Sequence, residues 1–287
     1  MRRIDELTVL VTGSTDGIGR RSAHGLASQG AKVLVHGRSL DRGRATVKEI
    51  TAVTGNVKVE YYNADFSALT EVRRLATEVA RDHPRLDVLV NNAGIGAGKK
   101  GGDVRELSAD GFELRFAVNY LAPFLLTHLL LPVLRESSPS RIVNVSSLGQ
   151  SPLDLADIML EHHYDSWNAY GQSKLALVMF TFDLAERIRD ETMTVNALSP
   201  GSLLDTKMVR EWFGRGRGDV QQGADAVMNL ATSPRVEGVT GRFFDREREA
   251  RANDQAYDRR VRKELYRISC RLTGLERPLI GEERDRE

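Results

Sequence analysis

The sequence is poor in cysteine and in net charge. Cys270 is the only cysteine among 287 residues, so no disulfide can form within the chain. A lone cysteine of this kind usually serves as a small apolar side chain. The formal net charge of +1 provides no broad field that would attract nucleic acid or an anionic membrane. The first residues also lack the apolar stretch of a signal peptide. We therefore expect a cytoplasmic protein without a nucleic-acid partner.

Long hydrophobic runs and metal-ligand patterns are also missing. The most apolar segment, residues 124–134, is interrupted by His128 and Pro132 and is too short to span a bilayer, so we expect no membrane anchor. His162 and His163 are adjacent and would point apart on a helix, and no second ligand pair accompanies them. We therefore expect no metal site. A chain of this length can bury a substantial core without metals or disulfides.

Short runs rich in Val, Ile and Leu alternate along the chain with segments of helix length. Strands are expected at 8–12, 32–37, 57–63, 86–94, 141–147 and 193–201, and helices at 17–30, 42–55, 69–84, 111–136 and 169–190. Strands that lack a strict polar alternation are typical of burial on both faces. The alternation therefore predicts an α/β fold with a doubly wound parallel sheet of the Rossmann type.

The first expected strand is followed by a glycine-rich loop. Gly13, Gly17 and Gly19 lie between this strand and the start of the first expected helix. Backbone N–H groups at a helix start, together with the helix dipole, can hold a pyrophosphate. An ordinary mobile turn would account for the same glycines, but the strand before them and the helix after them favour nucleotide binding.

Four motifs occur in a fixed order: TGSTDGIG at 12–19, NNAG at 91–94, IVNVSS at 142–147 and YGQSK at 170–174. Together they resemble the signature of the short-chain dehydrogenase/reductases, and the resemblance extends over residues 5–245. The segments VNYLAPFLLTHLLLPVL and SPRVEGVTGRFF are most similar to the retinol-dehydrogenase-like branch of that family. The resemblance implies a dinucleotide-binding and catalytic domain at 1–245.

The remaining residues, 246–287, form a charged C-terminal extension of the single domain. Apolar residues recur at helical spacing within 256–275, which predicts an amphipathic helix packed on the domain. We expect residues 277–287 to be frayed behind this helix.

The end of the second strand bears on the choice of cofactor. An acidic residue there would bind the ribose of NAD and repel a 2′-phosphate. The sequence has Arg38 instead, followed by Arg42 and Arg44, and the arginine fork suits a phosphate. We therefore expect NADP(H). NAD(H) is the alternative, because a solvated basic turn beside Asp41 explains the same residues, and Asp16 departs from relatives that carry a base in this loop.

The resemblance implies further contacts with the cofactor. Asp65 would bond the adenine, residues 91–94 would close over the adenosine ribose, and Thr206 would bond the nicotinamide amide from a loop one residue longer than usual. The expected cofactor-binding residues are Gly13, Ser14, Thr15, Gly17, Ile18, Gly19, Arg38, Asp65, Phe66, Asn91, Ala93, Gly94, Tyr170, Lys174, Pro200, Gly201, Leu203 and Thr206.

Tyr170 and Lys174 are four residues apart on an expected helix and therefore share a face. A free tyrosine has a pKa near 10. A fixed ammonium nearby favours the tyrosinate and lowers this pKa. We therefore expect Tyr170 to be the acid and base that serves hydride transfer between NADP(H) and a small carbonyl or alcohol substrate.

The resemblance also implies roles for Ser147 and Asn119. Ser147 would bond the substrate oxygen, with Ser146 as the competing candidate, and Asn119 would hold a water of the proton path. The plain alternative for Asn119 is a hydrogen-bonded amide near a helix kink at Pro123. Residues 148–169 are more numerous than in many relatives, and we expect them to form a wall of the substrate pocket. Residues 203–220 are expected to form a mobile lid.

Two other functional classes are compatible with parts of this pattern. A non-catalytic NADP(H)-binding sensor would need the glycine loop but not the set Asn119, Ser147, Tyr170 and Lys174. A sugar epimerase or dehydratase would be expected to have another glycine spacing and a larger C-terminal domain. Helices 111–136 and 169–190 resemble the usual dimer surface of the family, so a homo-oligomer is a further expectation.

Overall fold

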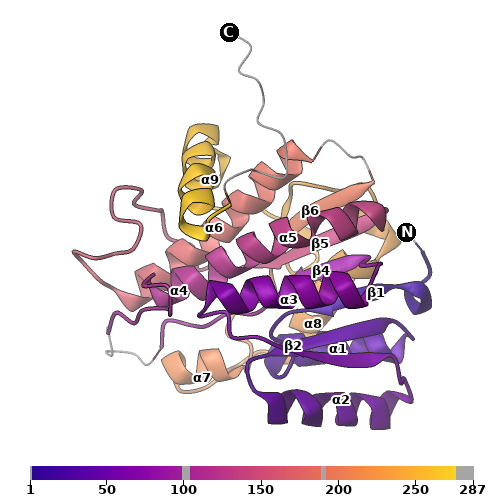
Figure 1. Ribbon diagram of the computed structural model, residues 1–287. Helices are drawn as coiled ribbons and strands as arrows, with labels where there is room; N and C mark the ends of the chain where they lie inside the picture. Colours follow the sequence, from indigo (N-terminus) through magenta and orange to yellow (C-terminus); the bar gives the residue numbers. More distant parts are fainter. Residues whose placement is uncertain (1, 99–103, 189–191, 276–287) are drawn as a thin grey trace.

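The computed structural model describes residues 2–98, 104–188 and 192–275. The described residues form an eight-stranded sheet with helices on both faces (Figure 1). The strands are β1 (Thr8–Val11), β2 (Lys32–Gly37), β3 (Val59–Asn63), β4 (Val88–Asn91), β5 (Ser140–Val145), β6 (Met193–Ser199), β7 (Phe243–Asp245) and β8 (Arg248–Glu249). Their order is β3-β2-β1-β4-β5-β6-β7-β8, and every pair is parallel except β7 with β8. The predicted doubly wound α/β fold is confirmed.

The helices form one layer on each face of the sheet. One layer holds α1 (Gly17–Ser28), α2 (Leu40–Thr54) and α8 (Val220–Thr232); the other holds α3 (Leu69–Asp82), α4 (Leu114–Phe116), α5 (Ala122–Glu136) and α6 (Ser166–Arg187). Two further helices, α7 (Lys207–Phe213) and α9 (Arg259–Thr273), lie outside these layers.

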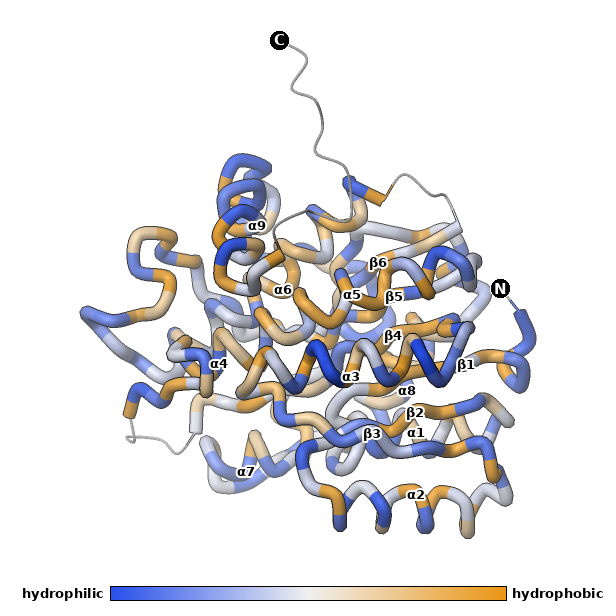
Figure 2. The backbone as a smooth tube through the Cα atoms, in the orientation of Figure 1, coloured by the Kyte–Doolittle hydropathy of each residue, from blue (hydrophilic) through white to orange (hydrophobic). Residues whose placement is uncertain are grey.

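Successive strand residues contribute to opposite layers of the core. In β1, Leu10 packs toward α3 and α5, whereas Val9 and Val11 pack toward α1 and α8. Because side chains alternate along a strand, a strand covered by helices on both faces needs apolar residues at every position. Figure 2 shows the outcome: the central strands are mostly hydrophobic, whereas α2 at the lower edge alternates between polar and apolar residues.

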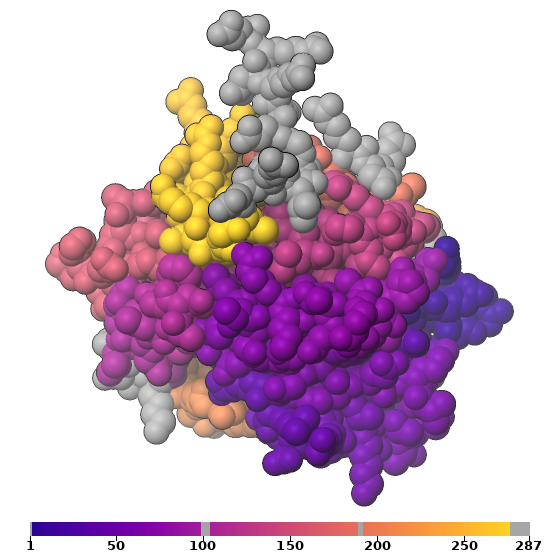
Figure 3. Space-filling view, viewed as in Figure 1, coloured from indigo at the N-terminus to yellow at the C-terminus, as the bar shows by residue number. Residues whose placement is uncertain are grey.

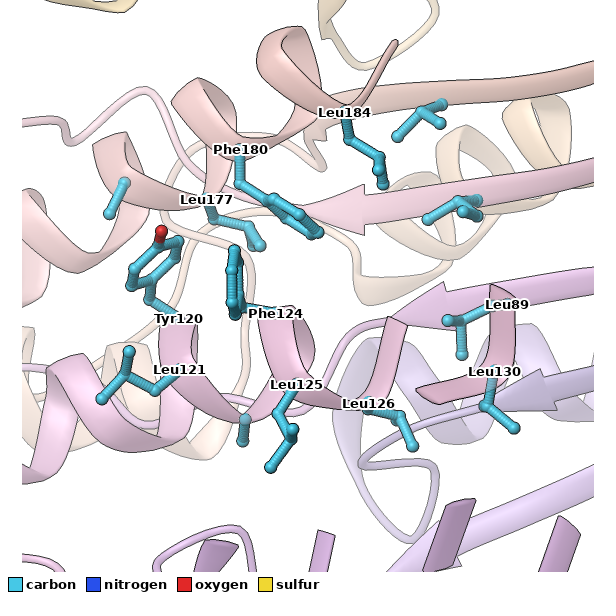
Figure 4. Close-up of a cluster of buried hydrophobic side chains, with 14 of the residues drawn as sticks. Leu89, Tyr120, Leu121, Phe124, Leu125, Leu126, Leu130, Leu177, Phe180 and Leu184 are labelled. Carbon is cyan, nitrogen blue, oxygen red and sulfur yellow. The ribbon is translucent and has the colours of Figure 1, made fainter. Parts of the chain in front are cut away.

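The apolar helix expected at 111–136 consists of three parts: α4, a π-helical turn at Ala117–Leu121, and α5. Taken together, Leu114–Glu136 contains an 18-residue window with a mean hydropathy of 1.6 and is long and apolar enough to cross a membrane, unlike the shorter run 124–134. Its most apolar window is nevertheless 89% buried inside the protein. In Figure 4, Phe124 of this segment faces Phe180 of α6, and their ring centroids are 5.0 Å apart. Burial in the core thus accounts for its apolar character.

The sequence prediction missed α8 and the two short strands β7 and β8. Helix α8 packs closely on α1, where Met228 occupies the space that a side chain on Gly25 would fill. Helix α6 also begins at Ser166, three residues earlier than predicted, because the Asp165 carboxylate accepts a hydrogen bond from the Asn168 N–H at 2.6 Å and caps the helix.

Helix α9 lies on the surface formed by α6 and the π-helical turn (Figure 3). The Tyr120 and Ser269 hydroxyls are hydrogen-bonded at 2.6 Å, and the Arg187 guanidinium lies 3.8 Å from the centre of the Tyr266 ring. This intramolecular packing covers part of the surface that we had considered for a dimer. The predicted frayed tail, 277–287, lies outside the described residues.

Candidate active site

The carboxyl ends of β1 and β4 lie side by side where the strand order reverses direction. In open α/β sheets, ligands bind at this switch point. The glycine loop follows β1, and the segment 91–94 begins at the last residue of β4. Topology therefore brings these two sequence motifs to one edge of the sheet.

The glycine loop has no room for side chains at two of its positions. A Cβ on Gly13, whose φ is +65°, would lie 2.7 Å from the Ala93 Cα. A Cβ on Gly19 would lie 2.5 Å from the Gly13 carbonyl oxygen. Gly17 opens α1, and its N–H donates to the Asp16 carboxylate at 2.8 Å. The loop therefore packs tightly against the end of β4, with the amino end of α1 behind it, as a phosphate site requires.

A histidine that the sequence analysis overlooked supports this loop. The Gly13 N–H donates to Nδ1 of His36 at 3.1 Å, and Nε2 of His36 lies 3.2 Å from the Ala64 carbonyl oxygen. Burial lowers the pKa of His36 to about 4, so the ring is neutral near pH 7 and accepts at Nδ1 while it donates at Nε2. Phe66, one of the expected cofactor residues, is buried and stacks on the same ring at 4.4 Å.

Some expected cofactor residues use their side chains within the protein. The Ser14 hydroxyl donates to the Val11 carbonyl at 2.6 Å. The Asn91 amide donates to Thr127 at 3.0 Å and to Asn144 at 2.8 Å. These side chains hold the loops in place, so backbone atoms remain for contact with a dinucleotide.

The three arginines expected near a 2′-phosphate differ in their contacts with the protein. Arg42 is bound to the glycine loop, with its guanidinium 2.9 Å from the Asp16 carboxylate and 3.3 Å from the Thr15 carbonyl. Arg38 and Arg44 are exposed, and neither has a hydrogen bond or ion pair from its side chain among the described residues. Arg38 follows Gly37, where a Cβ would lie 2.7 Å from Thr15 Cγ2, so it stands beside the glycine loop. Asp65, two residues after the end of β3, accepts a hydrogen bond from the Ser67 N–H at 2.9 Å.

The segment after β6 runs over this edge of the sheet. Pro200 is buried, and Gly201 and Leu203 have φ values of +131° and +52°. The Leu203 carbonyl accepts hydrogen bonds from the N–H groups of residues 217 and 218. Thr206 caps α7 by accepting from the Val209 N–H at 3.3 Å. The expected lid at 203–220 therefore contains helix α7, and hydrogen bonds join the beginning of the segment to its end.

Helix α7 and its cap approach the site from two sides. The Thr206 methyl group lies 3.6 Å from the position of a Cβ on Gly17, and Met208 fills the space that a side chain on Gly96 would take. Ile18, another expected cofactor residue, lies 3.2 Å from the position of a Cβ on Gly223 of α8. Thr206 and Met208 thus place α7 between the glycine loop and the loop after β4.

Tyr170, Lys174 and Ser147 come together at the carboxyl end of β5. Lys174 is buried, its Nζ donates to the Val145 carbonyl at 3.1 Å, and it lies 5.8 Å from the centre of the Tyr170 ring. The Ser147 hydroxyl lies near Tyr170, and both flank Gly149, where a Cβ would lie 3.4 Å from Ser147 Oγ and 3.8 Å from Tyr170 Cε1. A Cβ on Gly94 would lie 3.3 Å from Lys174 Nζ, so the loop after β4 closes over the ammonium.

The pKa values of this pair follow mainly from burial. Burial lowers the pKa of Lys174 from 10.5 to about 8. Burial also raises the pKa of Tyr170, and the nearby Ser147 hydroxyl opposes this only in part. The expected lowering of the Tyr170 pKa is therefore wrong for the protein alone, because loss of hydration raises this pKa.

The two adjacent serines have different surroundings. Ser146 is buried, and its hydroxyl donates to the Lys174 carbonyl at 2.7 Å, which ties β5 to α6. Ser147 is partly exposed, and its hydroxyl lies on the Tyr170 side of Gly149 and accepts from the Gly149 N–H at 3.0 Å. This geometry favours Ser147 over Ser146 as the residue that meets a substrate.

Asn119 is fully buried in the π-helical turn. Its carbonyl accepts from the Ile95 N–H at 2.8 Å, and its amide donates to the Ile95 carbonyl and to Ser173, both at 3.0 Å. The Ser173 hydroxyl donates in turn to the Tyr170 carbonyl at 2.7 Å. Both amide protons are thus bonded within the protein, and Asn119 links the loop after β4 to the helix that carries Tyr170 and Lys174.

A buried ion pair near this loop was also overlooked. The Arg115 guanidinium lies 3.3 Å from the Glu113 carboxylate, and both side chains are at most 3% exposed. Arg115 also donates to the carbonyls of Gly96 and Ala97, at 3.1 and 2.9 Å, and to the Tyr164 hydroxyl at 2.6 Å. It therefore joins the loop after β4 to the long segment 148–165. No local pattern reveals this cluster, because Tyr164 and the carbonyls of Gly96 and Ala97 are distant in sequence from Arg115.

Comparisons with known proteins agree with this geometry. Residues 7–215 match the family model for short chain dehydrogenases. The chain is 36% identical over 285 residues to mouse (Mus musculus) retinol dehydrogenase 13, covering 93% of this chain and 84% of that protein. It is also 36% identical over 278 residues to human retinol dehydrogenase 11, with coverages of 93% and 86%.

Solved structures show the same architecture. Salutaridine reductase from Papaver somniferum superposes with a TM-score of 0.68 at 24% identity, over 84% of this chain and 99% of that one, and supports the fold alone. An NADP complex of RhlG from Pseudomonas aeruginosa superposes with a TM-score of 0.66 at 28% identity, over 85% and 97%. The chain therefore belongs to the short-chain dehydrogenase/reductase family, on its retinol-dehydrogenase-like branch.

Proposed function

We propose that the chain is an NADP(H)-dependent oxidoreductase that interconverts a carbonyl and an alcohol, with Tyr170 and Lys174 as the acid–base pair. The observation that carries this proposal is the meeting of Ser147, Tyr170 and Lys174 beside the glycine loop. The names of the similar retinol dehydrogenases support alcohol chemistry, and the NADP complex of RhlG supports the cofactor.

The chemistry divides among three side chains. The cofactor, when bound, supplies the hydride for reduction or accepts it for oxidation. The Ser147 hydroxyl donates a hydrogen bond to the substrate oxygen, and the Tyr170 hydroxyl gives its proton to the oxygen as negative charge develops there. Because burial raises the pKa of Tyr170, the phenol is protonated at neutral pH, which suits the reductive direction.

Lys174 supplies positive charge beside the phenol. With a pKa of about 8, its amine is mostly protonated at pH 7. The ammonium stabilises the tyrosinate that remains after proton transfer, although burial opposes that charge. Ser173 and Asn119 act indirectly, because their hydrogen bonds fix the position of α6 relative to the loop after β4.

The test of the acid–base assignment is Tyr170→Phe. This change removes the proton donor and should lower kcat for aldehyde reduction by about 10²–10⁴-fold, while NADPH affinity stays within about twofold. Tyr257→Phe, which changes a tyrosine on the C-terminal extension, is the matched control and should leave kcat unchanged. A Tyr170→Phe variant that keeps most of its rate would refute the assignment. Tight NADPH binding by the unmodified protein without any turnover would instead favour the sensor.

The test of the cofactor assignment is Arg38→Ser. If Arg38 binds the 2′-phosphate, loss of its charged hydrogen bonds should lower kcat/KM for NADPH relative to NADH by about 10–100-fold. Arg235→Ser serves as the control, because Arg235 is also exposed but lies toward the amino end of β5, where Arg141 donates to the Ser233 carbonyl at 2.9 Å. An unchanged ratio of the two efficiencies would show that Arg38 does not read the phosphate.

A further inference from the structure

Both tryptophans of the sequence lie together next to Tyr170. Trp167 is in the first turn of α6, one turn before Tyr170, and its ring lies 5.7 Å from the phenol ring. Trp212 of α7 stacks on Trp167 with the ring centroids 5.4 Å apart and an angle of 27°. The Phe213 ring meets Trp167 edge-on at 6.0 Å. Helix α7 is therefore joined to the catalytic helix through aromatic contacts.

The indole of Trp167, the phenol of Tyr170 and the hydroxyl of Ser147 converge on one residue, Gly149. A Cβ on Gly149 would lie 3.4 Å from Ser147 Oγ, 3.6 Å from Trp167 Cζ2 and 3.8 Å from Tyr170 Cε1. We name the space between these four residues the Gly149 notch. Each distance is an ordinary van der Waals contact, and the φ of Gly149 is outside the left-handed region, so alanine fits the fold.

We propose that the Gly149 notch and the Trp167–Trp212 pair select substrates by the bulk of the group on the carbonyl carbon. The inference rests on the proposed function, because Ser147 and Tyr170 must hold the carbonyl oxygen. A carbonyl held by these two hydroxyls directs one substituent toward the indole. The missing side chain at Gly149 leaves room for that substituent, and the stacked Trp212 keeps the indole from moving away.

The aromatic cluster of Trp167, Trp212 and Phe213 exposes apolar surface to solvent. Trp167 remains 38% exposed and Phe213 49% exposed, although each already contacts another ring. Apolar surface of this kind, directly beside two catalytic hydroxyls, favours a compact hydrocarbon substituent over a charged or strongly hydrated one. Trp167 is therefore assigned as a substrate-contacting residue, and Trp212 as the residue that positions it.

The decisive variant is Gly149→Ala, assayed with NADPH on two aldehydes that differ only in bulk, acetaldehyde and pivaldehyde. The added methyl group narrows the notch, so kcat/KM for pivaldehyde should fall by about tenfold or more relative to acetaldehyde. NADPH affinity and melting temperature should not change. Trp167→Phe, which enlarges the same space, should shift the ratio in favour of pivaldehyde. Equal losses for both aldehydes in the two variants would overturn the inference and leave the proposed function intact.

A binding measurement separates the two proposals. In the Trp212→Phe variant, Trp167 is the only indole, and its fluorescence should change when the unreactive amide pivalamide is added in the presence of NADPH. Gly149→Ala combined with Trp212→Phe should weaken this response to pivalamide more than to acetamide. If the unmodified protein reduces no carbonyl at all, the proposed function fails, and the titration still decides the notch: equal responses to both amides would reject it.

Discussion

Removal of the buried ammonium by Lys174→Met should abolish turnover and yet stabilise the protein. Lys174 is 4% exposed, and burial lowers its pKa from 10.5 to about 8. Each pH unit between these values corresponds to about 1.4 kcal/mol, so at pH 7 the buried charge costs about 3 kcal/mol. Methionine has a similar shape and no charge. It loses the hydrogen bond to the Val145 carbonyl, worth about 1 kcal/mol, so the net gain at pH 7 is about 2 kcal/mol.

The gain should depend on pH in a defined direction. Between pH 8 and pH 10.5 the unfolded chain keeps the lysine proton while the folded chain has released it, so the stability of the unmodified protein rises with pH. At pH 9.5 the remaining cost of the charge is about 1.4 kcal/mol, which the lost hydrogen bond roughly offsets. The variant and the unmodified protein should then be almost equally stable.

The assay is urea denaturation of both proteins at pH 7 and pH 9.5, without cofactor. Lys48→Met removes an exposed lysine from α2 and should change the free energy of unfolding by less than about 0.5 kcal/mol at either pH. The reasoning is refuted if Lys174→Met is less stable than the unmodified protein at pH 7, or if its advantage is the same at pH 9.5.

Three further changes test other parts of the site. Gly13→Ala forces a side chain within 2.7 Å of Ala93 at a φ of +65°, so NADPH affinity should fall by at least about tenfold in a fluorescence titration; retained affinity would show that the loop can relax. Tyr164→Phe removes a partner of the buried Arg115–Glu113 pair and should cost about 1–3 kcal/mol in urea denaturation, and no loss would mean that water replaces the hydroxyl. Ser147→Ala should lower kcat with little effect on stability, whereas Ser146→Ala should mainly lower the melting temperature; the opposite result would exchange their roles.

The fold could be predicted from the sequence because its signals are local. Apolar runs such as Thr8–Val11 predict strands buried on both faces, and the spacing of Tyr170 and Lys174 places them on one helical face. The glycines of the loop after β1 were expected to serve a phosphate site at the start of a helix; in the structure Gly17 opens α1, and Gly13 packs closely against Ala93. These inferences need only the geometry of a strand, a helix or a turn.

The parts that the sequence could not determine depend on residues distant along the chain. The support of His36 for the glycine loop, the Arg115–Glu113–Tyr164 cluster and the Trp167–Trp212 stack join separate segments, and no periodicity marks them. Helix α8 was missed for the same reason, because its burial comes from packing on α1.

The sequence alone determined that this protein has a doubly wound sheet, a glycine-rich loop between the first strand and the first helix, and a tyrosine one helical turn from a lysine. Only the tertiary structure decided how those two groups ionise and which serine meets them. The physical reason is that hydration is lost to neighbours that folding brings together: burial raises the pKa of Tyr170 and lowers that of Lys174, and spacing along a helix contains no information about that burial.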